Sequence, residues 1–162
     1  MSVRPIRIFG DPVLKTVSDP IVPGRDVSGL VDDLLDTVRE PGRAGVAAPQ
    51  IGVNLRAFSY NVEGRVGYVL NPELVELSEE TVTVDEGCLS VPGFFFPRQR
   101  HIFARVRGVD ITGAPVELSG SGLMAQALQH EMDHLDGALY IDGLAPEVKR
   151  SAMRKIRESE WF

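Results

Sequence analysis

The residues that could do chemistry are concentrated in His130-Glu131-Met132-Asp133-His134, which has the spacing of an HExxH motif. Side chains four positions apart lie on one face of a helix, so both imidazoles can reach the same metal ion. Glu131 follows the first histidine and can take a proton from a water molecule held by that ion. The motif therefore predicts metal-assisted hydrolysis.

The helix that carries this motif is expected to turn both histidines inward. At ~100° per residue, the mostly apolar residues of the segment fall within an arc of about 160°. These are Leu123, Met124, Ala127, Leu128, His130, Glu131, His134 and Leu135, whereas Ala125, Gln126, Gln129, Met132, Asp133 and Asp136 occupy the other side. Ionisable groups on a buried face need partners. Two satisfied core histidines would leave Glu131 in the middle of the apolar arc unexplained, so metal binding is the better interpretation.

Two histidines do not complete a hydrolytic metal site, which uses three protein ligands and leaves one position open for water. The third ligand could be a carboxylate or the thiolate of Cys88, and spacing does not choose between them. Cys88 is the one cysteine of the sequence, so no internal disulfide can form. A lone cysteine can also be a small buried hydrophobe.

The elements that must position these residues follow from periodicity and from breaker residues. Residues 1–24 are proline-rich and are expected to be irregular. Helices are expected over 28–40, with Ser28 as the N-cap and Pro41-Gly42 as the stop, over 123–135, and over 146–160 with Pro146 at a first helical position. Strands are expected over 55–60, 68–70, 81–84 and around 102–106, and a hairpin over 109–118 with Thr112-Gly113 at its turn. Strands that occur in runs, apart from the helices, indicate an α+β fold. We expect antiparallel sheets packed around a central helix that carries the HExxH motif.

Composition limits the classes of protein that the chain can represent. A chain of 162 residues, with 43% hydrophobic and 25% charged residues, predicts a single domain over residues 1–162. The net charge of −6 disfavours a nucleic-acid partner, and the basic residues near the C-terminus are interpreted as a solvated helix face. No apolar run approaches the roughly 20 residues of a membrane span. The first residues lack the features of a signal peptide, so a cytoplasmic location is expected.

Three motifs, in a fixed order, resemble those of the peptide deformylase family. The family pattern GxGxAAxQ is similar to the segment that ends in Gly45-Val46-Ala47-Ala48-Pro49-Gln50, EGCLS matches residues 86–90, and QHExDH matches residues 129–134. Residues 8–14 also resemble the N-terminal segment of the family, so the resemblance covers most of the chain. EGCLS together with HExDH is highly specific.

The resemblance implies a role for each matching residue. Cys88, His130 and His134 would bind the metal, with water as the fourth ligand, and Glu131 would act as general base and then as general acid. The side-chain amide of Gln50 and the backbone N–H of Leu89 would hold the oxyanion that develops on the formyl group. A pocket for the methionine side chain would involve Val84, Leu123 and Ala127. Backbone contacts to an extended peptide would come from Ala44, Gly45 and Gly87. Glu86 would orient a ligand histidine.

The activity implied by the resemblance is hydrolysis of the N-formyl group from the N-terminal formylmethionine of nascent polypeptides, with release of formate. Two histidines and a cysteine would make a natural zinc site by ligand chemistry. The resemblance implies ferrous iron, one Fe2+ per chain, with Zn, Ni or Co able to substitute. Because the substrates are nascent chains, the ribosome near its exit tunnel is a candidate partner.

The sequence departs from the family pattern in two places, and the first concerns substrate preference rather than chemistry. Arg43 replaces the first glycine of the loop and is expected at the mouth of the substrate site. The segment after EGCLS is shorter than in some members and carries Phe94, Phe95 and Phe96, which could pack in the core or form an apolar wall of the cleft.

Two other functions remain open. One is a zincin-type metalloprotease built on HExxH alone, whose third ligand would not be Cys88, and the other is a metal-binding scaffold without activity.

Overall fold

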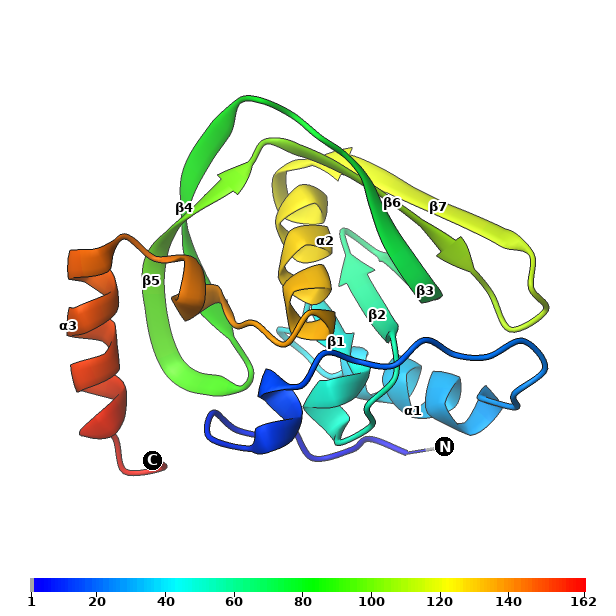
Figure 1. Cartoon of the computed structure of the whole chain (residues 1–162), viewed down its shortest axis with the longest axis horizontal. Coiled ribbons are helices and arrows are strands. Elements are labelled where there is room, and N and C mark those ends of the chain that lie inside the picture. The colour runs from blue at the N-terminus through cyan, green and yellow to red at the C-terminus, as the bar shows by residue number, and fades with distance from the viewer. Residues whose placement is uncertain (1) are drawn as a thin grey trace.

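The computed structural model describes residues 2–162, and its helices and strands surround one long central helix (Figure 1). The helices are α1 (Ser28–Val38), α2 (Gly122–Leu135) and α3 (Pro146–Arg157). Three short 3-10 helices are η1 (Pro12–Lys15), η2 (Ala48–Ile51) and η3 (Tyr140–Gly143). The strands are β1 (Gly45–Ala47), β2 (Ala57–Val62), β3 (Arg65–Leu77), β4 (Thr81–Cys88), β5 (Val91–His101), β6 (Phe103–Val109) and β7 (Pro115–Ser121).

All strand pairs within the two sheets are antiparallel. Five strands form one sheet in the order β1-β2-β3-β6-β7, and β4 pairs with β5 in a separate two-stranded sheet. In Figure 1, α2 stands between the β4–β5 pair and the larger sheet, while α3 lies on the far side of β5. The expected α+β fold, with antiparallel sheets around the helix that carries the HExxH motif, is confirmed.

Helix α2 is buried on more than one side, which differs from the two-sided helix that its sequence predicts. Ala125, Gln129 and Met132 were expected opposite the apolar arc, yet all three are buried. Leu123 was expected inside that arc, yet 43% of it is exposed. The reason is that the helix is enclosed by two sheets, so one inward arc cannot describe its surroundings. Leu123 lies in its first turn, at the open end.

The side chain of Gln129 connects α2 to the end of β5. Its Oε1 accepts a hydrogen bond from the backbone N–H of His101 at 2.9 Å, and its Nε2 donates to the carbonyl of the same residue at 2.9 Å. The amide thus pairs with His101 as a neighbouring strand would. This pairing explains how a polar side chain is accommodated inside the core.

Helix α1 begins one residue differently from the prediction. Ser28 is the first helical residue and Val27 precedes it as the cap, so the expectation of Ser28 as N-cap was wrong. The backbone N–H and the hydroxyl of Ser28 both donate to Oδ1 of Asp26, at 3.0 and 2.7 Å. This carboxylate, rather than Ser28, satisfies donors at the start of the helix.

Strand β5 was missed because its sequence contains Pro92, Gly93 and Pro97. Proline has no N–H and cannot donate a hydrogen bond to a neighbouring strand, so it is rare in an inner strand, which pairs along both edges. A strand that pairs along one edge tolerates proline at positions that face away from the partner strand. Among residues 2–162, strand β5 pairs with β4 alone, so it meets this condition. Strand β3 is also much longer than the predicted 68–70, and register shifts interrupt its pairing with β6.

Helix α3 starts at Pro146 as predicted and ends at Arg157 rather than at residue 160. It buries Ala152 and Ile156 against the cluster formed by β5 and η3. Five basic residues of this region were expected on a solvated face: Arg150, Arg154, Lys155 and Arg157 are exposed, and Lys149 is partly exposed. No helix within residues 2–162 combines the length and the apolar character that crossing a bilayer requires.

Candidate active site

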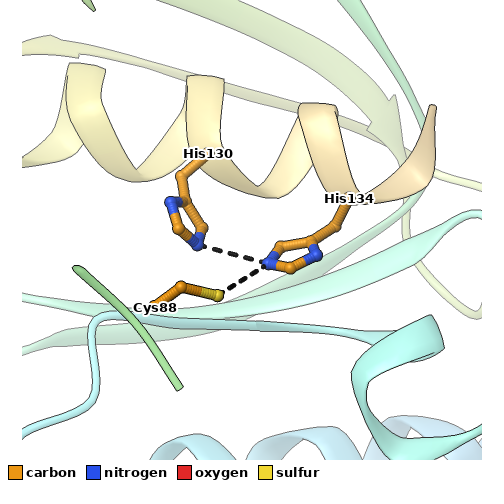
Figure 2. Close-up of side chains that lie close together, drawn as sticks. All are labelled: Cys88, His130 and His134. Atoms are coloured by element: carbon orange, nitrogen blue, oxygen red, sulfur yellow. Dashed lines mark hydrogen bonds between the residues drawn. The ribbon is translucent and has the colours of Figure 1, made fainter. Parts of the chain in front are cut away.

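Cys88, His130 and His134 meet at the side of α2 that faces the end of β4 (Figure 2). Nε2 of His134 lies 3.2 Å from Nε2 of His130 and 3.4 Å from Sγ of Cys88, and the three candidate ligand atoms are within 4.8 Å of one another. The two histidines come from successive turns of α2, and the cysteine is the last residue of β4.

These distances suit a tetrahedral metal site. Typical metal–nitrogen and metal–sulfur bonds at a tetrahedral angle would place two nitrogens about 3.3 Å apart and a nitrogen and a sulfur about 3.6 Å apart. The observed separations of 3.2 and 3.4 Å are close to both values. Three donors leave one tetrahedral position open, as in hydrolytic sites. The residues therefore fit a divalent metal ion.

A buried chain of charged groups holds the first histidine. Nδ1 of His130 lies 2.7 Å from Oε2 of Glu86, and Arg100 donates to both oxygens of that carboxylate at 2.7 and 2.6 Å. Arg100 also donates to Asp133 at 2.8 Å. Burial alone would raise the pKa of Glu86, but the hydrogen bonds from Arg100 and His130 outweigh it and lower that pKa to about 2. Glu86 is therefore an ionised carboxylate that points Nε2 of His130 toward the site.

Glu131 lines the cleft beside the ligands without a protein partner for one of its oxygens. The residue is 2% exposed, and its Oε1 is buried with no hydrogen-bond partner among residues 2–162. Burial is the main cause that raises the pKa of Glu131 to about 7. Such a carboxyl can both accept and return a proton near neutral pH.

Gly45 lies directly against this carboxyl group. A Cβ atom on Gly45 would stand 2.5 Å from Oε2 of Glu131, closer than side-chain carbons approach other atoms. The absence of a side chain at this position of β1 thus leaves the space that Glu131 occupies.

Gln50 is buried in η2 with its amide orientation fixed from both ends. Its Oε1 accepts from the backbone N–H of Ala47 at 2.9 Å. Its Nε2 donates to Oγ of Ser90 at 3.2 Å and lies 3.9 Å from Sγ of Cys88. The donor end of the amide therefore faces the ligand cluster.

A cleft of about 420 Å³ opens onto this cluster. Most of the residues predicted from the sequence line it: Ala44, Gly45, Gln50, Gly87, Cys88, Leu89, Leu123, Ala127, His130 and Glu131. Arg43 also lines it, and its Nη1 donates to the carbonyl of Thr37 at 2.9 Å. His134 and Glu86 lie beneath the cleft rather than on its surface, and both are buried.

Val84 is the one predicted substrate-binding residue that the cleft does not include. It lines a neighbouring hollow of about 400 Å³ together with Leu123 and Gln126, which belong to both hollows. Leu123 and Gln126 therefore form the ridge between the cleft and this second hollow.

The three phenylalanines divide between core and cleft. Phe96 is buried and its ring stacks on Tyr140 at 6.0 Å, whereas Phe94 and Phe95 line the cleft. Phe95 is 64% exposed and covers Gly87, because a Cβ on Gly87 would lie 2.5 Å from its ring.

Two strand edges border the cleft. Strand β1 is at the end of the five-stranded sheet, and β4 belongs to a sheet of two strands, so each has an edge that pairs with no other strand within residues 2–162. Gly45 belongs to β1 and Gly87 to β4. An extended peptide could add to such edges through its backbone.

Sequence reasoning missed several residues that shape the site: Ser90, Pro92, Arg100, Gln126 and Asp133. Ser90 and Asp133 belong to the recognised motifs, so their place in these motifs was a signal that could have marked them as site residues. Arg100 and Gln126 carry no local signal, because their roles depend on which strand and which hollow they meet.

Comparisons with known proteins point to one family. Residues 3–150 match the family described as Polypeptide deformylase. A peptide deformylase of Acidothermus cellulolyticus is 51% identical over 162 residues, covering 99% of this chain and 89% of that protein. A peptide deformylase of Parafrankia sp. is 51% identical over 163 residues, with the same coverage of 99% and 89%. A crystal structure of a peptide deformylase from Legionella pneumophila is similar with a TM-score of 0.88 and 35% identity, over 97% of this chain and 95% of that one.

Proposed function

The chain belongs to the peptide deformylase family, whose members hydrolyse the N-formyl group of nascent polypeptides, and from this premise we propose how its residues divide the reaction. The observation that carries the proposal is one cysteine sulfur and two imidazole nitrogens within 4.8 Å of one another, beside the buried carboxyl of Glu131. We assign the whole activity to a single domain over residues 1–162.

Cys88, His130 and His134 would hold the metal ion. A tetrahedral arrangement with one open position is supported by the distances among their donor atoms. We propose Fe2+ as the working ion, because the family resemblance implies it, with Zn, Ni or Co able to replace it. The bound ion would supply Lewis acidity and lower the pKa of water. Glu86 would keep His130 oriented through its Nδ1, supported by their 2.7 Å contact.

Glu131 would move the proton. Its carboxylate would take a proton from the attacking water and then deliver it to the nitrogen of the departing methionine amine. A pKa of about 7 supports both roles, since neither protonation state is strongly disfavoured near neutral pH. The buried Oε1 lacks a partner among residues 2–162, which supports a role in which this oxygen binds a substrate atom or a water molecule.

The oxyanion of the formyl group would be stabilised by Nε2 of Gln50 and by the backbone N–H of Leu89. The hydrogen bond from Ala47 to Oε1 of Gln50 supports this role, because it leaves the donor end facing the ligands. A donor fixed before the reaction costs no reorganisation when charge develops.

Substrate would enter along the two strand edges. Ala44, Gly45 and Gly87 would contact the peptide backbone, and the methionine side chain would contact Leu123 and Ala127, with Val84 in the hollow behind the ridge. Phe94 and Phe95 would add apolar wall.

Because the substrates are nascent chains, we place the enzyme in the cytoplasm and keep the ribosome near its exit tunnel as a candidate partner.

The test is anaerobic purification with metal analysis, coupled to formate release from formyl-Met-Ala-Ser. We expect about one ferrous ion per chain and rapid formate release. Stoichiometric metal in a folded protein that releases no formate would contradict the proposal. It would then favour a protease or a scaffold.

A further inference from the structure

One wall of the cleft is a bulge in β5 that β4 does not hold. In the register of the two strands, Gly87 pairs with Phe95 and the next residue, Cys88, pairs with Val91. Residues 92–94 therefore have no partner on β4, and all three line the cleft. Pro92 has no N–H to donate, and Gly93 adopts a φ of +84°, which favours glycine. Strand pairing alone does not fix this part of the wall.

The bulge is instead held from behind by side chains outside the sheet. Nε1 of Trp161 donates to the carbonyl of Pro92 at 3.0 Å. The Trp161 ring also meets the ring of Phe94 edge-on, at 6.3 Å between centroids and 64° between planes. The hydroxyl of Tyr140 donates to the carbonyl of Phe94 at 2.9 Å. The carbonyls of Pro92 and Phe94 are thus held by side chains that do not belong to either sheet.

Trp161 differs from Tyr140 in its other contacts and in its burial. Tyr140 is fully buried and packs on the rings of Phe96 and His130, so its loss would disturb the core and a metal ligand. Trp161 follows α3 and is only partly buried, and its N–H and ring contact the bulge at Pro92 and Phe94. Its two ties to the wall, the hydrogen bond and the ring contact, both end within residues 92–94.

We propose that Trp161 is a positioning residue for substrate binding, which holds the bulge of residues 92–94 in the shape of the cleft wall. The inference rests on the proposed function, since it assumes that the peptide binds in this cleft. Trp161 does not touch the reacting atoms, so its effect should fall on KM and leave kcat nearly unchanged. Losing it would let the wall sample other conformations, and substrate would have to select the competent one.

The first test compares three variants, with formate release from formyl-Met-Ala-Ser by the metal-loaded enzyme. Trp161→Ala removes both ties, and we expect KM to rise about tenfold with kcat within about twofold, from the usual worth of a hydrogen bond and an aromatic pair. Trp161→Phe keeps a ring but loses the N–H, and should raise KM about threefold. Phe162→Ala is the matched control, because Phe162 packs on Phe9 and not on the bulge, and it should keep the wild-type KM.

A second readout uses the fact that Trp161 is the one tryptophan of the chain. If the wall responds to peptide, tryptophan emission should change on saturation of metal-loaded wild-type or Phe162→Ala protein with the product Met-Ala-Ser. Unchanged emission would count against the inference. Calorimetric titration with the same peptide compares all variants without turnover, and we expect weaker binding by the same factors as in KM.

A wild-type KM in folded Trp161→Ala and Trp161→Phe would overturn the inference. It would also be overturned if these variants lost kcat in proportion to a loss of bound metal. If Trp161→Ala does not fold, Trp161→Phe decides alone. A wild-type chain that releases no formate would instead contradict the proposed function, while calorimetry would still decide the role of Trp161.

Discussion

The contact between Gly45 and Glu131 allows a test of the proposed base that leaves Glu131 itself in place. In a Gly45→Ala variant the new Cβ would lie 2.5 Å from Oε2, 2.8 Å from Cδ and 3.0 Å from Cγ of Glu131. Ordinary contacts begin at 3.4 Å, so the carboxyl group must retreat by about 1 Å. Rotation about its last bond does not suffice, because Cγ is also too close.

The size of the expected effect follows from this displacement. A misplacement of about 1 Å in a reacting group can cost about 100-fold in rate, or about 2.7 kcal/mol of barrier. The clash is with the end of a flexible side chain, so folding and metal content should change little. We therefore expect kcat for formyl-Met-Ala-Ser to fall about 100-fold.

The matched control is Gly29→Ala in α1, where a Cβ would meet nothing within 4 Å. Alanine stabilises a helix relative to glycine by up to about 1 kcal/mol, so this variant should be at least as stable as wild type and fully active. A double variant with Glu131→Gln separates the causes. If Gly45→Ala acts through Glu131, it should add little to the loss caused by Glu131→Gln. Wild-type kcat in metal-loaded Gly45→Ala, or full additivity in the double variant, would refute the reasoning.

Four single substitutions test the parts of the site. Glu131→Gln should keep one metal ion per chain by elemental analysis and lose about 10²- to 10⁴-fold in kcat, and loss of metal together with activity would contradict its role as a base. Cys88→Ala should lose stoichiometric metal and formate release; full metal content and hydrolysis in this variant would favour the protease alternative. Arg100→Met would remove the guanidinium from the buried carboxylate of Glu86 and leave it the contact with His130, and we expect chemical denaturation to show a loss of about 3–5 kcal/mol. Glu86→Gln removes the charge but not the side chain, and should weaken metal binding about 10- to 100-fold in a chelator competition; unchanged affinity would mean that Glu86 does not orient His130.

The parts of the site that lie close together in the sequence could be predicted from it. His130, Glu131 and His134 are brought to one place by the periodicity of a single helix, which the sequence encodes directly. Cys88 required more, because β4 and α2 are distant in the chain and only the resemblance of the EGCLS motif joined them. Gln50 was recognised in the same way.

The residues that escaped prediction depend on tertiary neighbours. Arg100 reaches Glu86 because β5 folds back beside β4, and the prolines of β5 concealed that strand. The burial of Gln129 could not be foreseen either, since it depends on the backbone of His101 lying opposite its amide. A helix enclosed by two sheets carries a weaker pattern than a helix on a surface, which is why the predicted arc failed at Met132. At Leu123 the arc failed because this residue lies in the first turn of α2 and is exposed.

The placement of Cys88 on one sheet and of both histidines on the central helix has a consequence for the mechanics of the chain. An ion bound by Cys88 and His134 would cross-link residues 46 positions apart. Closing a loop of this length removes chain entropy worth about 4 kcal/mol from the unfolded state, if the bond behaves as a permanent link. The ion would then cross-link the two-stranded β4–β5 sheet to α2. The same atoms that serve the chemistry would thereby also keep the two halves of the cleft together.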